Sequence, residues 1–161
     1  MRWGLVDRIE RIEVGRSAVG VRTWDPELPL FQDHFPDFPV VPGVLLLESM
    51  AQVAGKLIGY TVRKERGDWP FPILSLMEKV KFRKFVRPGE RTELQVELVA
   101  LRDESALIKG RVVVDGRWRA RAEQFFVFNA VPFEDEAERK KVEQCERDAL
   151  TALWPDYPGD F

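Results

Sequence analysis

The sequence has a single cysteine, a single histidine and almost no excess of either charge. The lone cysteine, Cys145, excludes an internal disulfide bond and is typical of a reducing compartment. A net charge of −2 gives the chain no overall attraction to nucleic acid, so we expect no nucleic-acid partner. A charged partner must therefore be met by a local patch.

Long uninterrupted apolar runs are also missing. The most apolar stretch, Val40 to Tyr60, has the length of a membrane span, but Pro42, Glu48, Gln52 and Lys56 interrupt it. A buried core helix is the better interpretation, and we expect no membrane span. The N-terminus also lacks the apolar core of a signal peptide, which favours a cytoplasmic protein.

The composition that remains is ordinary for a globular chain, with 45% apolar and 32% charged residues over 161 positions. We expect one core domain over residues 1–132, followed by an amphipathic helix and an aromatic tail over 133–161. The C-terminal helix is predicted over Glu134–Leu153. Its thin apolar stripe consists of Val142, Cys145, Ala149 and Ala152.

Strand-like segments account for most of the remaining chain. Alternating patterns and turn residues predict six strands, over Leu5–Glu13, Ser17–Thr23, Ile73–Phe85, Arg91–Leu101, Ser105–Val114 and Arg117–Phe128. Asp115-Gly116 is a strong hairpin signal, and beyond it Arg119 and Arg121 are expected on the opposite strand face from Trp118. Because strands and helices do not alternate, the sequence predicts an α+β fold with an antiparallel sheet.

The central helix is predicted from about Gly43 to Tyr60, with Pro42 in its first turn and a charged connection over residues 63–69. Projected at about 100° per residue, the helix is apolar over most of its circumference, which is typical of a helix enclosed by other structure. A narrow stripe remains where another group can approach closely. The stripe consists of Glu48, Gln52, Gly55, Lys56 and Gly59.

The only histidine, His34, precedes Glu48 by fourteen residues, and Glu48 lies inside the apolar helix. A buried glutamate is costly unless it is paired or performs chemistry, and histidine is the side chain that titrates nearest neutral pH. The pair is typical of an acid–base site with one proton donor and one proton acceptor. The alternatives are a structural or merely exposed histidine and a core carboxylate satisfied by its neighbours.

The segment around this pair resembles a known family. The pattern His-Phe-Pro-x-x-Pro-x-x-Pro-Gly-Val-Leu-x-x-Glu-x-x-Ala-Gln, over residues 34–52, is similar to the hot-dog-fold 3-hydroxyacyl-[acyl-carrier-protein] dehydratases of type II fatty-acid synthesis. Similarity in the first strand and in a later strand and turn extends the resemblance to roughly residues 4–128. In this chain Asp33 replaces the usual glycine, and Ile73-Leu74 replaces a tyrosine that often gates the acyl tunnel.

The resemblance implies a sheet wrapped around a long helix, and a hydro-lyase that needs no metal or organic cofactor. His34 would remove the C2 proton of a (3R)-3-hydroxyacyl thioester, and Glu48 would protonate the departing hydroxyl to leave a trans-2-enoyl product. The backbone N–H of Gly43, beside Val44 at the helix N-terminus, would polarise the thioester carbonyl, and Gln52 would orient Glu48. Relatives that also isomerise the double bond typically carry aspartate at the Glu48 position, which favours dehydration alone.

The resemblance also implies two partners, an acyl carrier protein that carries the substrate and a second copy of this chain. Histidine and glutamate meet across the interface of a homodimer in this family, and the dimers can assemble further into a trimer of dimers. Two other functions stay open. One is a hot-dog acyl-thioesterase, which would release a free thiol, and the other is a non-catalytic module that binds acyl carrier protein without turnover.

Four basic residues gather near the end of the third predicted strand, at Lys79, Lys81, Arg83 and Lys84. A solvated strand face is one interpretation of this cluster. The other is a docking patch for an acidic acyl carrier protein, which a local basic cluster on a net-negative chain favours.

Overall fold

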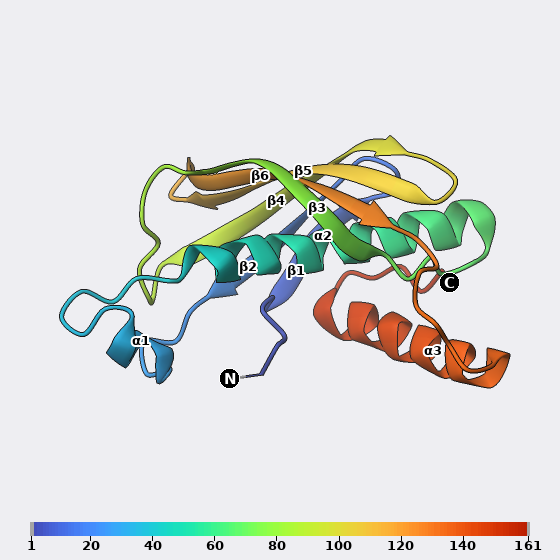
Figure 1. Ribbon diagram of the computed structural model, residues 1–161, viewed down its shortest axis with the longest axis horizontal. Coiled ribbons are helices and arrows are strands. Elements are labelled where there is room, and N and C mark those ends of the chain that lie inside the picture. Colours follow the sequence, from blue (N-terminus) through green and yellow to red (C-terminus); the bar gives the residue numbers. More distant parts are fainter. Residues whose placement is uncertain (1, 161) are drawn as a thin grey trace.

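The computed structural model describes residues 2–160 and places one long helix against a single sheet (Figure 1). Met1 and Phe161, which begin and end the two predicted segments, lie outside the described residues. The elements are β1 (Arg8–Glu13), β2 (Ser17–Thr23), α1 (Leu30–Asp33), α2 (Gly43–Arg66), β3 (Ile73–Phe82), β4 (Arg91–Leu101), β5 (Ser105–Val114), β6 (Arg117–Val127) and α3 (Glu136–Leu153). The predicted α+β hot-dog fold with an extra C-terminal helix is confirmed.

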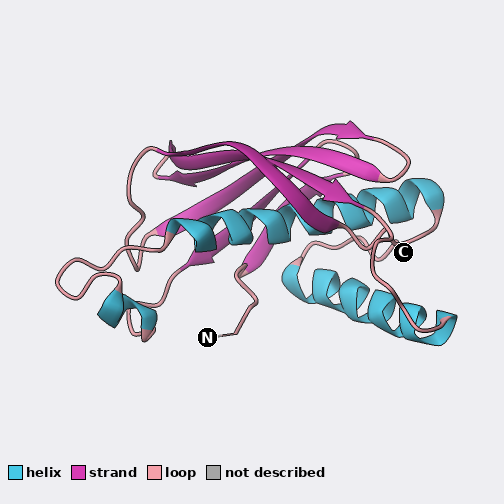
Figure 2. Cartoon of the chain, viewed as in Figure 1, coloured by secondary structure: helices cyan, strands magenta, loops and turns pink. Residues whose placement is uncertain are grey.

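The six strands form one antiparallel sheet in the order β1-β2-β4-β5-β6-β3. Figure 2 shows the strands as a layer curving over one side of α2, while α3 lies on the side of α2 away from the sheet. The sheet therefore has two edges, β1 and β3, and α2 is enclosed from two directions. The boundary at residues 132 and 133 stays a prediction.

The core is the contact between α2 and the inner face of the sheet. Met50, Val53 and Leu57 are each 0% exposed, at the three- and four-residue spacing that aligns side chains along one helix face. Gly110 on β5 leaves room for Met50, because a Cβ atom at that position would overlap the thioether. The apolar side chains of alternate strand positions close the core from the other side.

The predicted end of the central helix was wrong, since α2 continues past Tyr60 to Arg66. The charged residues expected to form a connection instead form the last turn, with Arg63, Lys64 and Arg66 near the negative end of the helix dipole. Gly67 ends the helix in the left-handed conformation, at φ 82°, and its N–H donates to the Arg63 carbonyl at 2.9 Å.

The prediction that Arg119 and Arg121 share one strand face was also wrong. An irregularity in the pairing of β5 with β6, between Val112 and Val113, disturbs the alternation, so Arg119 is buried while Arg121 stays exposed. The Arg119 guanidinium pairs with Glu90 at 3.0 Å. Burial raises the pKa of Glu90, but the Arg87 backbone N–H and the Arg119 guanidinium lower it more, leaving it below the ordinary value.

Helix α3 packs through a different face from the predicted stripe. Cys145 and Ala152 are exposed, whereas Leu150 is buried and Val142 and Leu153 are half-buried. Cys145 lies about 60° around the helix from Val142, on the solvent side of the face that 142, 146, 149 and 153 share. The Asp135 side chain caps the helix by accepting from the Glu138 N–H at 2.8 Å.

The C-terminal tail folds back onto the last turns of α2. The Tyr60 hydroxyl donates to the Asp160 carboxylate at 2.8 Å, and the Lys64 ammonium pairs with Asp160 at 2.6 Å. Burial and then the Asp160 hydrogen bond raise the pKa of the Tyr60 phenol above its ordinary value. Trp154 packs edge-on against Tyr60, with ring centroids 5.3 Å apart. The end of the chain is thus fastened to the last turns of α2.

We expect two glycines on α2 to respond oppositely to substitution by alanine. A Cβ atom at Gly59 would overlap the buried ring of Trp69, whereas one at Gly55 would meet no atom within 4 Å. Gly59→Ala should lower the free energy of unfolding by about 1–3 kcal/mol, and Gly55→Ala should raise it by about 0.5–1 kcal/mol because helical glycine is entropically costly. Denaturant unfolding measures both, and equal effects would contradict the packing described.

Candidate active site

The N-terminus of α2 offers unpaired backbone donors at the edge of the molecule. Pro42 precedes the helix, and its carbonyl accepts from Leu45 at 2.9 Å. The N–H groups of Gly43 and Val44 fall in the first turn, where no intrahelical acceptor exists and the helix dipole is positive. A Cβ at Gly43 would lie 2.6 Å from the ring of the exposed Phe82 side chain, so glycine lets this ring lie directly against the helix N-terminus. The site can stabilise a developing negative charge.

Glu48 lies one turn further along α2 and is held by two neighbours. The Gln52 amide donates to Glu48 Oε1 at 3.2 Å, and the Trp3 indole N–H donates to the same oxygen at 3.1 Å. Gln52 is itself held, because its Oε1 accepts from Leu5 N–H at 2.8 Å and its Nε2 donates to the Trp3 carbonyl at 2.7 Å. The predicted contact between Gln52 and Glu48 is present.

Trp3 was not predicted as part of the site. It is separated from Glu48 by 45 residues, and the sequence carries no local signal that joins the N-terminal segment to α2. Gln124 on β6 was missed for the same reason. It is 0% exposed and donates to the Leu47 carbonyl at 3.0 Å, which fixes the helix backbone next to Glu48.

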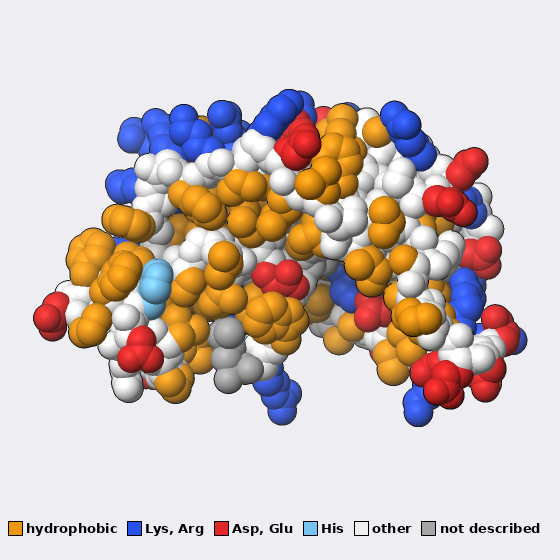
Figure 3. Space-filling view, in the orientation of Figure 1, with side chains coloured by type: hydrophobic (Ala, Val, Ile, Leu, Met, Phe, Trp, Pro, Cys, Tyr) orange, Lys and Arg blue, Asp and Glu red, His pale blue; other side chains and the backbone are white. Residues whose placement is uncertain are grey.

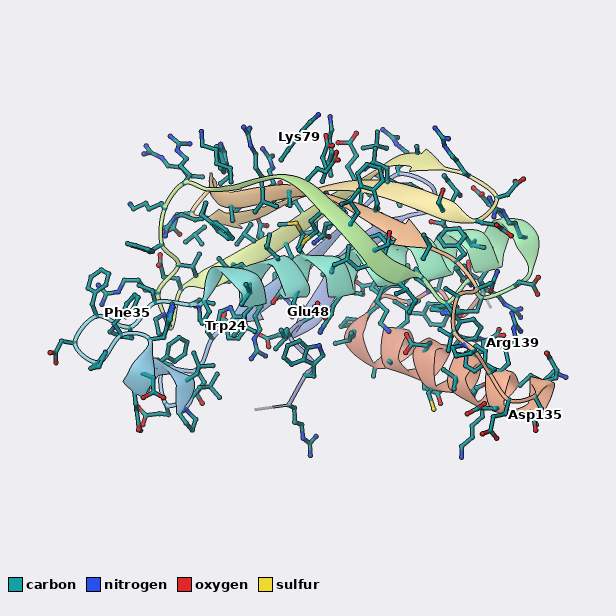
Figure 4. The ribbon with its side chains drawn as sticks, viewed as in Figure 1. Trp24, Phe35, Glu48, Lys79, Asp135 and Arg139 are labelled. Atoms are coloured by element: carbon teal, nitrogen blue, oxygen red, sulfur yellow. The ribbon has the colours of Figure 1, made fainter. Side chains whose placement is uncertain are left out.

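Glu48 opens into a cavity of about 510 Å³ between α2, the start of β3 and α3. Figure 4 shows Glu48 on α2, on the side where α3 lies. Its lining is mostly apolar and aromatic. It includes Ala51, Gln52, Gly55, Lys56, Trp69, Phe71, Ile73, Leu74, Phe126, Phe133, Val142, Glu146, Ala149 and Leu153. A larger hollow of about 1080 Å³ lies on the outer face of the sheet, lined mainly by polar and charged residues, and it does not include Glu48.

His34 lies in the loop between α1 and α2 and is half-buried. Its Nδ1 is 3.1 Å from the Val40 carbonyl oxygen, and the His34 carbonyl accepts from Val40 N–H at 3.0 Å. Because a carbonyl oxygen only accepts, Nδ1 carries the proton in this contact and Nε2 keeps its lone pair. The Phe35 ring stacks on the imidazole, with centroids 4.5 Å apart. His34 is therefore oriented as a proton acceptor.

Within one chain, no hydrogen bond or ion pair among the described residues joins His34 to Glu48. Figure 4 shows Phe35, the neighbour of His34, in the loop beyond the N-terminal end of α2, away from Glu48. The histidine surface in Figure 3 is bordered by hydrophobic side chains. Within one chain, His34 and Glu48 therefore lie in separate places.

The β3 edge of the sheet is open. Every residue of β3 except Leu74 is exposed, including several large apolar side chains. These are Ile73, Leu76, Met77, Val80 and Phe82. An unpaired strand with exposed apolar side chains is a typical site for pairing with another chain. Hydrophobic side chains also cover much of the middle of the face in Figure 3.

The four predicted docking residues are all exposed. Lys79 pairs with Glu123 at 3.4 Å on the outer sheet face, where Figure 4 shows it pointing away from α2. Arg83 lies over the Trp118 ring, with its guanidinium carbon 5.2 Å from the ring centroid, while Lys81 and Lys84 extend from the same end of β3. Among residues 2–160 no cluster of three or more metal-ligating side chains occurs, and no helix there is long and apolar enough to cross a membrane.

Comparison with known proteins supplies the family. Residues 2–123 match the model of the FabA-like domain. The 3-hydroxyacyl-[acyl-carrier-protein] dehydratase FabZ of Syntrophotalea carbinolica is 40% identical over 124 residues, covering 77% of this chain and 83% of that protein. The protein of the same name from Clostridium acetobutylicum is 37% identical over 123 residues, covering 76% and 85%.

Solved structures share the fold at lower identity. The dehydratase heterocomplex ApeI:P from Xenorhabdus doucetiae aligns with a TM-score of 0.65 at 18% identity, covering 87% of this chain and 89% of that chain. A hypothetical thioesterase from Streptococcus pneumoniae with coenzyme A aligns with a TM-score of 0.58 at 12% identity, covering 76% and 87%. The fold is thus common to several activities, but the sequence matches are specific. The chain belongs to the FabA-like family, among the relatives of 3-hydroxyacyl-[acyl-carrier-protein] dehydratase FabZ.

Proposed function

We propose that this protein dehydrates (3R)-3-hydroxyacyl-acyl carrier protein to trans-2-enoyl-acyl carrier protein in fatty-acid or related lipid or polyketide biosynthesis, in the cytoplasm. The observation that carries the proposal is the hydrogen bond between His34 Nδ1 and the Val40 carbonyl. It leaves Nε2 as a proton acceptor on a fixed ring, which is what abstraction of a C2 proton requires. The names and 37–40% identity of the curated relatives support the same reaction.

In the proposed reaction, His34 Nε2 takes the C2 proton and the C2–H electron pair forms the C2=C3 double bond. The C3–O bond breaks, and the Glu48 carboxylic acid gives its proton to the departing hydroxyl, which leaves as water. The Gly43 N–H, beside Val44, stabilises the charge that develops on the thioester carbonyl oxygen. Gln52 positions Glu48 through the 3.2 Å hydrogen bond. Transfer of the proton from His34 back to Glu48 completes the cycle.

The proposal includes a homodimer, because His34 and Glu48 make no contact with each other within one chain. Pairing of β3 with its copy would cover the exposed apolar side chains of this edge, and it would bring the loop that holds His34 toward the partner's α2. Assembly of dimers into a trimer of dimers is compatible with this arrangement. Each dimer would contain two composite sites.

The carrier protein is proposed to dock at the end of β3. Lys81, Arg83 and Lys84 are exposed there, and Phe85 follows them at the surface. Phe85 packs edge-on against Phe38 of the loop that holds His34, with ring centroids 6.1 Å apart. A basic patch beside the His34 loop would attract an acidic carrier and present its thioester to the site.

Removing either proposed catalytic group should abolish turnover. Glu48→Gln keeps the shape of the side chain but cannot supply a proton, and His34→Ala removes the base. Each should lower kcat for the interconversion of 3-hydroxyacyl and trans-2-enoyl carrier protein by about 10²–10⁴-fold. Gln144→Glu on the exposed face of α3 is the matched control. Full activity in either site variant would refute the assignment, and release of free thiol by the wild type would identify a thioesterase.

Mixing the two inactive variants tests whether the site is composite. A mixed dimer of His34→Ala and Glu48→Gln would contain one site with both substitutions and one with neither. Activity should therefore return after the two proteins are unfolded and refolded together. If the mixture stays as inactive as each variant alone, histidine and glutamate act within one chain or not at all.

The β3 edge should hold the dimer. Leu76→Glu would place a charge in the proposed interface, where it would be buried without a partner. We expect the dissociation constant of the dimer to rise about tenfold or more, with a parallel loss of activity at low protein concentration. Sedimentation velocity measures this, with Val99→Glu on β4 as a control at a similarly exposed apolar site. A Leu76→Glu protein that remains as dimeric as the control would place the interface elsewhere.

Reversing the charge of Lys84 should weaken carrier docking without affecting the chemistry. For Lys84→Glu we expect KM for the carrier-linked substrate to rise about fivefold or more at low salt, with the KM for a pantetheine-linked substrate unchanged. Lys141→Glu on α3 changes the net charge equally at a remote, exposed position. Equal effects of the two variants would mean that only net charge matters and that no docking patch exists here.

A further inference from the structure

The cavity that begins at Glu48 continues along the polar-and-glycine stripe of α2. Gln52, Gly55 and Lys56 follow Glu48 on that stripe and all line the cavity. Gly55 contributes an open position, because a Cβ atom there would meet nothing within 4 Å. The stripe therefore forms one wall of a channel that runs away from the proposed proton donor.

The opposite wall comes from outside the part of the chain that matches the family. The family match ends at residue 123, whereas Val142, Glu146, Ala149 and Leu153 of α3 line the far part of the cavity. These four side chains recur at the spacing of a single helix face. The segment before α3 adds Phe133, whose ring packs on Phe71 with centroids 4.8 Å apart.

Helix α3 is held firmly enough to act as a wall. Asp135 caps its N-terminus, and Leu150 is 0% exposed against the rest of the core. Glu143 pairs with Arg63 of α2 at 3.6 Å. Arg139 donates to the Trp69 carbonyl, and Figure 4 shows Asp135 and Arg139 at the end of α3 where the chain enters it. These contacts fix the distance between α3 and α2.

An ion pair crosses the cavity from α2 to α3. The Lys56 ammonium lies 2.9 Å from Glu146 of α3, and the Lys56 side chain is only 13% exposed. Lys56 is eight residues beyond Glu48, which places it about 12 Å further along the helix axis. An alkyl chain that displaced water from this pair would have to desolvate two charges without replacing their hydrogen bonds. An alkyl chain that starts at Glu48 and runs along this wall therefore meets a polar barrier at the pair, with further apolar lining beyond it.

We propose that α3 sets the acyl-chain length that the protein accepts. The acyl chain leaves the reacting carbons at Glu48, passes over Gly55, and ends against α3 before the pair of Lys56 and Glu146. The proposal rests on the proposed function, since it takes Glu48 as the reacting end of the channel. It adds a specificity element that lies in residues 133–153 and not in the family domain.

Two alanines on α3 allow a matched test. Ala149 lines the cavity, whereas Ala152 is exposed on another face of the same helix. The measurement is equilibrium binding of trans-2-enoyl-pantetheine thioesters of increasing chain length to the full-length protein, by calorimetry. For Ala149→Phe the affinity ratio of the longest to the shortest chain that the wild type binds should fall about tenfold or more, and for Ala152→Phe it should not change.

Gly55→Leu provides a second variant from the opposite wall, where the structure has space for the new side chain. It should shift the same ratio in the same direction, with circular dichroism confirming that each variant is folded. The proposal would be overturned if the affinity ratio of the longest to the shortest chain were unchanged in both Ala149→Phe and Gly55→Leu. It would also be overturned if the wild type bound no acyl chain. Dehydration assays on the same proteins separate the proposed dehydratase function from the proposed role of α3 in chain length. Chain-dependent binding without turnover would refute the proposed function alone, and turnover with an unaltered chain profile would refute the role of α3 alone.

Discussion

The need to enclose α2 determines most of this structure. The helix is apolar over nearly its whole circumference, so water must be excluded from almost all of it. The sheet covers one side, and Met50, Val53 and Leu57 are completely buried against it. The stripe that begins at Glu48 and ends at Lys56 lies outside this apolar contact and has polar neighbours. The position of the cavity follows from this, because a channel can run along the helix only where the sheet does not seal it.

The two proposed reactive side chains, Glu48 and His34, are held in place by different kinds of contact. Glu48 is fixed on a rigid helix and oriented by hydrogen bonds from Gln52 and Trp3. His34 lies on a loop, and its orientation depends on one bond to the Val40 carbonyl and on stacking against Phe35. A loop residue is suited to a site completed by a second chain, since pairing can adjust the loop without disturbing the helix that holds the acid.

Much of the fold could be predicted from local patterns, because alternation and turn residues specify strands over short distances. β2, β4 and β5 have the bounds that the sequence predicts. The predictions that were wrong or incomplete concern features that depend on contacts between elements distant in the sequence. Arg119 is buried because an irregularity in strand pairing shifts the faces of β6. Cys145 is exposed because α3 packs through the face that Val142, Ala149 and Leu153 share, which lies beside the predicted stripe. The contact of Trp3 with Glu48 depends on tertiary packing over 45 residues, which no local pattern encodes.

The proposed chemistry and the proposed chain-length selectivity occupy the two ends of one helical stripe. Side chains four residues apart on a helix share a face, so Glu48, Gln52 and Lys56 form a line that starts at the proposed proton donor and ends at the ion pair with Glu146. The matched domain supplies these three side chains, and α3 supplies Glu146, the partner of the last one. A wall added outside the domain can therefore change the length of the channel without moving the carboxylate.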